Sequence, residues 1–201
     1  MVSELQADYL IKLARNAVEQ YIETNKKITP TLKDQELNEE AGVYVTLKSF
    51  PEEELRGEIG YPYPMGEISS NIIDNAISAA LHDPRFPSIK KDELNTIIFE
   101  ISILSRPKIL TVSSPEDYIS KIKIGKNGLI IKYGGATGVL LPQIPIEYNW
   151  GAKEFLCQTC QKAGLPKEMW KRPTVEIYTF EAEIIKEEKP LGKVIKKRLF
   201  R

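Results

Sequence analysis

The sequence is poor in histidine and cysteine and carries no net charge. Its 201 residues include one histidine and two cysteines, and 28 basic side chains balance 28 acidic ones. Because the charges balance, the protein has no overall positive field to attract nucleic acid. One histidine and two cysteines do not supply the four ligands of a structural zinc site. We therefore expect neither a metal nor another cofactor.

Long apolar runs are also missing. The longest stretch without a charged residue, 133–146, has 14 residues and contains three glycines and two prolines. It is too short and too broken to cross a membrane as a helix. The N-terminal sequence lacks the basic start and apolar core of a signal peptide, and Cys157 and Cys160 would close only a tiny loop as a disulfide. These absences predict a cytoplasmic protein without a membrane segment.

The sequence does contain enough apolar residues for a sizeable core. Hydrophobic residues make up 42% of the chain, and its length suits one large domain or two small packed ones. It has 25 isoleucines and 21 lysines but only 6 glutamines, a composition like that of heat-adapted proteins. Residues 186–201 hold seven basic and two acidic side chains. These residues form a basic tail, and we expect its end, 193–201, to be a solvated terminus, with docking to a partner or nucleic acid as the alternative.

Apolar periodicity predicts helices and strands that are interspersed along the chain. Ser3 and Gln6 have the spacing of a capping box at the start of a long amphipathic helix. No regular strand-helix-strand rhythm follows, so the predicted class is α+β, with a mainly antiparallel sheet flanked by helices. The expected helices are 3–24, 67–81, 114–122 and 150–163, and the expected strands are 41–50, 55–59, 97–104, 128–133, 137–141 and 174–185.

The segment Leu55-Arg56-Gly57-Glu58-Ile59-Gly60 is the most informative about function. In a strand, Arg56 and Glu58 share one face while Leu55 and Ile59 point into the core. Gly57 between them leaves the backbone open to close approach. A guanidinium and a carboxylate beside bare backbone are able to hold a polar ligand. The alternative is a surface ion pair of little energetic value.

A second polar segment, Asp83-Pro84-Arg85-Phe86-Pro87, directly follows the predicted helix 67–81. Arg85 is either a site residue or the partner of a nearby acid. His82 is either a proton shuttle near neutral pH or a simple partner of the helix dipole. Gln143 lies in the kinked strand exit Pro142-Gln143-Ile144-Pro145, where its amide either binds a ligand or serves the turn.

Two other motifs favour structural roles. Cys157 and Cys160 match a C-x-x-C string, but they fall well inside a predicted helix, whereas redox cysteines gain a low pKa near a helix N-terminus. Residues 134–138 are rich in glycine, but no Gly-Lys-Ser/Thr follows them. We interpret that segment as the turn of a hairpin.

Five short motifs occur in one order along nearly the whole chain. They are Leu55-Arg56-Gly57-x-Ile59-Gly60, Asp83-Pro84-Arg85-Phe86-Pro87, Leu140-Leu141-Pro142-Gln143, Trp150 with Glu154-Phe155-Leu156, and Cys160-x-x-Ala163-Gly164-Leu165. In this combination the chain resembles archaeal-type single-domain members of the AMMECR domain family. The resemblance implies one such domain over residues 1–201, with a larger and a smaller subdomain and the Leu55–Gly60 segment beside a cleft between them.

The family has no established reaction, and its links to Memo-type and radical-SAM partner proteins are associations. Its pattern has cysteine where this chain has Glu58. Glu58 argues against a cysteine nucleophile shared by all members, because a carboxylate has different nucleophilicity and no thiol redox chemistry. Either position 58 is not catalytic, or Glu58 acts as a base or ligand.

The leading hypothesis is the binding of a small polar or anionic ligand, or of a partner protein, in the cleft. Arg56 and Arg85 would orient an anionic group, and Glu58 would hold or deprotonate it. The alternative is an enzyme with Glu58 as general base and His82 or Asp83 as acid, acting on a nucleotide-like or RNA substrate. A third is a nucleic-acid accessory protein that uses the basic tail. The expected site residues are Arg56, Gly57, Glu58, Asp83, Arg85 and Gln143.

Overall fold

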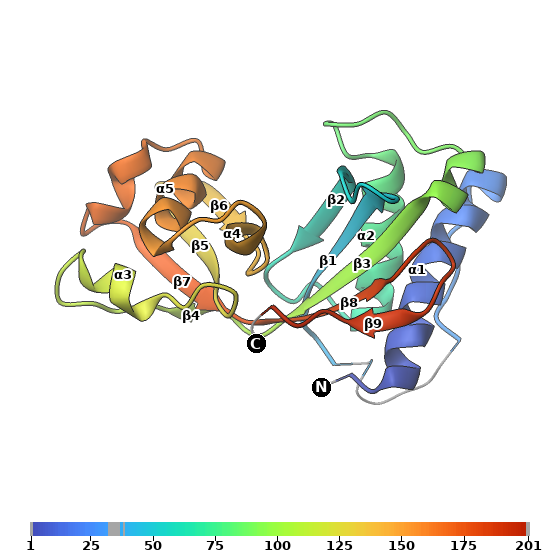
Figure 1. Ribbon diagram of the computed structural model, residues 1–201, viewed down its shortest axis with the longest axis horizontal. Coiled ribbons are helices and arrows are strands. Elements are labelled where there is room, and N and C mark those ends of the chain that lie inside the picture. The colour runs from blue at the N-terminus through green and yellow to red at the C-terminus, as the bar shows by residue number, and fades with distance from the viewer. Residues whose placement is uncertain (1, 32–36, 38, 200–201) are drawn as a thin grey trace. The chain divides into compact units, whose positions relative to one another are not determined.

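The structure is a computed structural model that describes residues 2–31, 37 and 39–199. The chain divides into two compact units (Figure 1). Unit 1 consists of Met1–Leu104 and Glu183–Lys197, and unit 2 consists of Ser105–Ala182 and Arg198–Arg201. The chain therefore leaves unit 1 after its third strand and returns to it for the last two.

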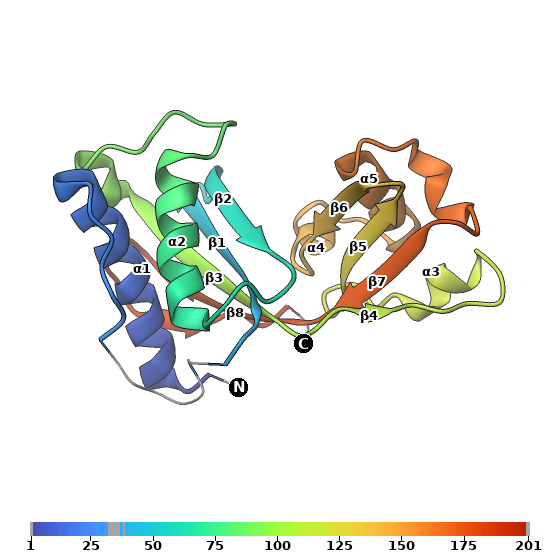
Figure 2. The same cartoon turned by 180° about the vertical axis from the view of Figure 1, so that it is seen from behind.

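Unit 1 is a five-stranded sheet of order β2-β1-β3-β8-β9 with helices α1 and α2 on one face. Figure 2 shows both helices in front of the sheet, and Figure 1 shows the strands from the other side. Strand β1 pairs antiparallel with β2 and β3, and β8 pairs antiparallel with β9. The elements are α1 (Glu4–Thr24), β1 (Gly42–Ser49), β2 (Leu55–Tyr61), α2 (Ile68–Leu81), the 3-10 helix η1 (Asp92–Thr96), β3 (Ile97–Leu104), β8 (Ala182–Glu187) and β9 (Val194–Lys196).

Helix α1 begins where the capping box predicts. The Gln6 backbone N–H donates to Ser3 Oγ at 3.2 Å, and the Ser3 N–H donates to Gln6 Oε1 at 2.7 Å. The helix ends at Asn25, which takes the left-handed conformation of a C-terminal cap. Its apolar stripe, with Leu10, Ala14 and Val18 fully buried, packs into the core of unit 1.

The two faces of the sheet in unit 1 differ in character. Val43, Val45 and Leu47 alternate along β1 and are buried against the helices. Their neighbours point to the opposite face, because successive side chains of a strand alternate. That face carries a row of hydroxyl and charged groups, and most of them are buried. We call it the polar face; its residues are Tyr44, Thr46, Lys48, Glu58, Glu100, Ser102, Lys186 and Lys197.

Unit 2 is a four-stranded antiparallel sheet of order β4-β7-β5-β6 with its own core. Gly134 and Gly135 take positive φ values of 52° and 90° in the turn between β5 and β6, so the predicted hairpin is confirmed. The elements are β4 (Lys108–Ile109), α3 (Asp117–Lys121), β5 (Gly128–Tyr133), β6 (Ala136–Leu140), α4 (Ile144–Glu147), α5 (Ala152–Lys162), η2 (Lys167–Lys171) and β7 (Glu176–Phe180).

The α+β class with antiparallel sheets and flanking helices is confirmed. The expected single strand 174–185 is wrong, because it is two strands in two different sheets. The chain crosses between the sheets at Glu181, whose backbone N–H donates to Ser105 Oγ and whose C=O accepts from the Ser105 N–H. The alternation of apolar residues continues through the crossing, because Phe180 before it and Ile184 after it are both buried. The sequence pattern therefore does not reveal that the chain passes from one sheet to the other.

The expectation of a solvated terminus over 193–201 is wrong for residues 194–196, which form β9. Lys186 and Glu187 are buried at the end of β8, and β9 pairs with β8 in the sheet. The basic side chains Lys186, Lys196 and Lys197 form ion pairs with glutamates of unit 1. Lys193 and Lys196 are exposed, but the apolar Val194 and Ile195 between them are half-buried in the strand, so this part of the tail belongs to the sheet.

A buried ion pair joins α1 to β8. Arg15 Nε lies 2.5 Å from Glu187 Oε1, and Arg15 Nη2 lies 2.7 Å from Glu187 Oε2. Arg15 also donates to the carbonyl groups of Leu94 and Ile97, and its guanidinium lies 4.6 Å from the centre of the Phe99 ring. The Phe99 N–H completes the shell of Glu187 at 2.9 Å. Because both charges are paired and hydrogen-bonded, the pair is compatible with the core.

We expect Arg15→Met to lower the free energy of unfolding by about 3–5 kcal/mol, because it leaves Glu187 as an uncompensated buried charge. The control is Lys12→Met, which removes an exposed pair with Asp8 and should cost no more than about 1 kcal/mol. Urea denaturation followed by circular dichroism measures both. Equal losses in the two variants would contradict a structural role for the buried pair.

Candidate functional site

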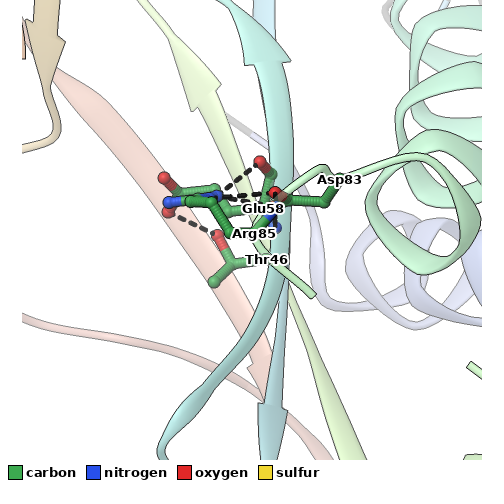
Figure 3. A network of polar contacts seen from close by, with 4 residues as sticks. All are labelled: Thr46, Glu58, Asp83 and Arg85. Atoms are coloured by element: carbon green, nitrogen blue, oxygen red, sulfur yellow. Dashed lines mark hydrogen bonds and ion pairs between the residues drawn. The ribbon is translucent and has the colours of Figure 1, made fainter. Parts of the chain in front are cut away.

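The site is centred on Glu58 in β2, a strand at the edge of its sheet. An edge strand leaves backbone N–H and C=O groups without a partner strand. At Glu58, the loop after α2 supplies these partners (Figure 3). The Glu58 N–H donates to Asp83 Oδ2 at 2.9 Å, and Arg85 Nη2 donates to the Glu58 C=O at 3.0 Å. We call this arrangement the clamp: Asp83 and Arg85 replace a neighbouring strand at one residue.

The Asp83 carboxylate is the buried centre of the clamp, with 2% of its side chain exposed. It accepts from the Arg85 backbone N–H at 3.1 Å, from Arg85 Nε at 2.9 Å and from Arg85 Nη2 at 2.6 Å. The bond from an N–H two residues ahead is the usual turn of an aspartate. Burial raises the pKa of Asp83, but the hydrogen bonds from Arg85 and from the backbone outweigh it and lower the pKa to about 2.

Gly57 brings helix α2 against β2. A Cβ at Gly57 would lie 2.2 Å from the carbonyl oxygen of Ala79 in α2, so no larger residue fits without moving the helix. The open space that the sequence predicts at Gly57 is therefore filled by α2. This close packing matters for the site because the chain directly after α2 carries Asp83 and Arg85 to the edge of β2.

The Glu58 side chain lies on the polar face between β1 and the clamp. Thr46, its partner in the register of β1 and β2, donates from Oγ1 to Glu58 Oε2 at 3.3 Å. The Arg85 guanidinium is close enough that the Glu58 charge, after the larger effects of Asp83, contributes to a raised pKa of Arg85. Figure 3 shows Glu58, Arg85 and Thr46 together on one side of the strand.

Tyr44 covers the strand next to Glu58. A Cβ at Gly60 would lie 2.4 Å from Cγ of Tyr44, so the tyrosine ring takes the place of a side chain at position 60. Burial, followed by the negative charge of Glu58, raises the pKa of Tyr44, so its hydroxyl stays protonated at neutral pH. Sequence reasoning missed both Tyr44 and Thr46, although strand alternation over 41–50 places them on one face.

Arg85 is only partly used by the clamp. Its Nε and Nη2 hold Asp83 and the Glu58 carbonyl group, whereas Nη1 makes no hydrogen bond with any residue that the structure describes. The side chain is 40% exposed. The guanidinium is thus held through two of its nitrogens, near the Glu58 carboxylate, on a side chain that is partly exposed.

Arg56 does not pair with Glu58, although their predicted position on one strand face suggests that pair. The register of β1 and β2 pairs Leu47 with Gly57 and Lys48 with Leu55, so Arg56 is the extra residue of a bulge. Simple alternation does not apply there. Its Nε and Nη2 donate to the Glu93 carboxylate of η1 at 2.5 and 3.1 Å. Arg56 is therefore held in an ion pair with Glu93.

The two other candidates, His82 and Gln143, take part in other local structures. His82 is exposed and caps the C-terminus of α2 through its backbone N–H. Gln143 belongs to unit 2, where it is buried at the N-terminus of α4. Of the expected set, the structure brings Glu58, Asp83 and Arg85 into one network and adds Thr46 to it.

The two cysteines are buried free thiols in α5. Burial raises the pKa of Cys157 and raises that of Cys160 to about 11, so both thiols are protonated at neutral pH. Among the residues that the structure describes, no group of three or more histidine, cysteine, aspartate or glutamate side chains is arranged to hold a metal. In the same part of the chain, no helix is both long and apolar enough to cross a membrane.

We expect Gly57→Ser to lower the free energy of unfolding by about 1–3 kcal/mol, because the new side chain collides with α2. Gly151→Ser is the matched control, since nothing lies within 4 Å of a Cβ at Gly151 and serine suits this helix N-cap. Chemical denaturation of both variants measures the difference. A Gly57→Ser protein as stable as its control would show that α2 does not depend on this contact.

The clamp should also make stability depend on acid pH. The pKa of Asp83 is lowered from 3.8 to about 2 in the folded protein. Its stabilising contribution is therefore fully present above about pH 4 and is lost as the pH falls toward 2. Thermal melts between pH 4 and pH 2 should show a steeper fall in Tm for the wild type than for Asp83→Asn. Asp74→Asn, at an exposed ion pair with Lys27, should follow the wild type, and parallel profiles for all three proteins would refute this role of Asp83.

Comparison with known proteins places the chain in a family. The AMMECR1 family model matches residues 11–185. A protein of Methanopyrus kandleri is 45% identical over 190 residues, covering 94% of this chain and 92% of its own length. One of Methanocaldococcus jannaschii is 44% identical over 194 residues, with 96% of each chain covered. The crystal structure of an uncharacterised protein from Pyrococcus horikoshii superposes with a TM-score of 0.95 at 40% identity and 98% coverage of both chains. The chain is thus a member of the AMMECR1 family.

Proposed function

We propose that the protein binds a small polar or anionic ligand on the polar face of unit 1, at Glu58 and Arg85. One observation carries the proposal: the guanidinium that fixes the edge of β2 belongs to a partly exposed side chain, keeps one amino group outside the clamp, and lies near the Glu58 carboxylate. Both groups are held by packing and hydrogen bonds before any ligand arrives. Such preorganised polar groups lose little conformational entropy when a ligand binds.

Each side chain would take a distinct part in binding. Arg85 Nη1 donates to an anionic or carbonyl oxygen of the ligand, because its other two nitrogens are already engaged. Glu58 accepts from an N–H or O–H group, and the protonated Tyr44 hydroxyl adds a donor near Glu58. Arg56 stays with Glu93 and supports the bulge of β2. The proposal rests on residues of unit 1 alone and is confined to binding.

The ion pairs of the basic tail favour such a ligand over nucleic acid. Lys186, Lys196 and Lys197 each pair with a glutamate of unit 1, so their charges are largely neutralised by the protein itself. Nucleic-acid binding depends on free lysine and arginine side chains that neutralise phosphates. The two free cysteines suit a reducing compartment, so we place this activity in the cytoplasm.

A thermal-shift screen with nucleotides, S-adenosylmethionine and short RNAs tests the proposal. A ligand present at about 100 times its Kd is expected to raise Tm by about 5 °C or more. Glu58→Gln should reduce that shift, because it removes the carboxylate that accepts from the ligand.

Glu54→Gln is the control, since Glu54 is an exposed residue of the turn before β2. The same shift in Glu58→Gln and Glu54→Gln would rule out Glu58 as a ligand-binding residue. Failure of every probe to change Tm would count against a small-molecule ligand of these classes.

A further inference from the structure

A second charged cluster lies on the polar face, across the strands from the clamp, because Thr46 on β1 stands between Glu58 on β2 and Glu100 on β3. Lys186 Nζ lies 2.6 Å from Glu53 Oε1. Lys48 Nζ and Lys197 Nζ lie 4.0 and 3.4 Å from the same oxygen of Glu100. The side chains of Lys48 and Lys186 are only 9% and 11% exposed. We call these three lysines and two glutamates the lysine cluster.

The three lysine ammonium groups repel one another electrostatically and attract their glutamate partners. Bringing like charges together in a poorly solvated place is unfavourable unless anions compensate them. Burial raises the pKa of Glu53, but Lys186, Lys48 and Lys197 together outweigh it and lower the pKa. All three ammonium groups therefore lie close enough to stabilise a negative charge at the position of the Glu53 carboxylate.

The two glutamates of the cluster differ in how firmly they are built in. Glu100 stands in the middle of β3 with 1% of its side chain exposed. Glu53 comes from the turn between β1 and β2, is 41% exposed, and has a left-handed backbone with φ of 54°. A glutamate in that conformation has no local preference for it. Glu53 thus reaches from a surface turn to Lys186, and its partly exposed side chain is less firmly enclosed than that of Glu100.

We propose that Lys48, Lys186 and Lys197 form a binding site for a phosphate group, and that the Glu53 carboxylate occupies this site until a ligand displaces it. Lysine binds phosphate as a point charge. A phosphate dianion compensates three such positive charges better than the single negative charge of a carboxylate does. Metal cations are disfavoured by the same three charges. Because the lysines are mostly buried, the site suits an isolated or terminal phosphate rather than the backbone of a nucleic acid.

This site is separate from the ligand site proposed at Glu58 and does not depend on it. The two share one sheet face, since Thr46 pairs with Glu58 on β2 and with Glu100 on β3. A ligand with a phosphate at one end and a polar group at the other has the right chemistry for both. Glu58→Gln should leave phosphate binding unchanged, which keeps the two proposals distinguishable.

Isothermal titration calorimetry with inorganic phosphate tests the inference. Glu53→Gln removes the competing carboxylate charge and should tighten phosphate binding by about tenfold, the effect of about 1.4 kcal/mol. Lys186→Gln or Lys197→Gln, added to Glu53→Gln, should weaken it again by at least as much. Lys197 is the more exposed of the two, so its variant keeps the test valid if Lys186→Gln does not fold.

Glu52→Gln is the matched control, because Glu52 is exposed in the same turn. Its substitution changes the net charge by the same amount as Glu53→Gln does. Its phosphate affinity should equal that of the wild type. The inference fails if Glu52→Gln and Glu53→Gln tighten binding equally, or if Glu53→Gln binds phosphate no better than the wild type. In Glu53→Gln, tighter binding of phosphate than of glycerol phosphate assigns the site to the free anion, and the reverse order assigns it to a phosphomonoester.

Discussion

The ion pair between Arg15 and Glu187 connects the first helix of the chain to the strand that returns from unit 2. It also holds η1 and β3 through the carbonyl groups and the Phe99 N–H that complete its shell. The position of β8 in the sheet therefore depends on it. Because side chains alternate along a strand, fixing Glu187 toward the helices turns Lys186 to the polar face. The position of Lys186 on that face is thus tied to an interaction on the other side of the sheet.

The segments around Glu58 and Asp83, which lie 25 residues apart in the sequence, form one hydrogen-bonded structure. Gly57 lets α2 pack closely on β2, and the chain leaving α2 then delivers Asp83 and Arg85 to the free edge of the same strand. The clamp holds the N–H and C=O of residue 58 and makes no use of its side chain there. The cysteine that the resemblance implies for this position and the glutamate of this chain are thus both compatible with one scaffold. The side chain at 58 is where chemistry can vary while the framework stays the same.

The sequence predicted those parts of the structure that local physics determines. The capping box at Ser3, the glycine hairpin of unit 2 and the end of α2 before Asp83 all follow from short-range hydrogen bonding and backbone sterics. The crossing at Glu181 was missed because burial looks alike in either sheet. In the site, the link between Asp83 and the edge of β2 needs a tertiary contact that no spacing reveals. Arg56 was paired with the wrong partner because a bulge interrupts alternation at that residue.

The hydrogen bonds between Ser105 and Glu181 bear on how unit 1 assembles. They bring together the two points where the chain enters and leaves unit 2, with the Ser105 N–H 2.9 Å from the Glu181 carbonyl oxygen. The entropy of closing a flexible loop grows with its length. A folded unit 2, with β4 paired to β7 just inside these points, replaces that long loop by a fixed junction. For the folding of unit 1, the whole of unit 2 acts as a tight turn does between the strands of a hairpin.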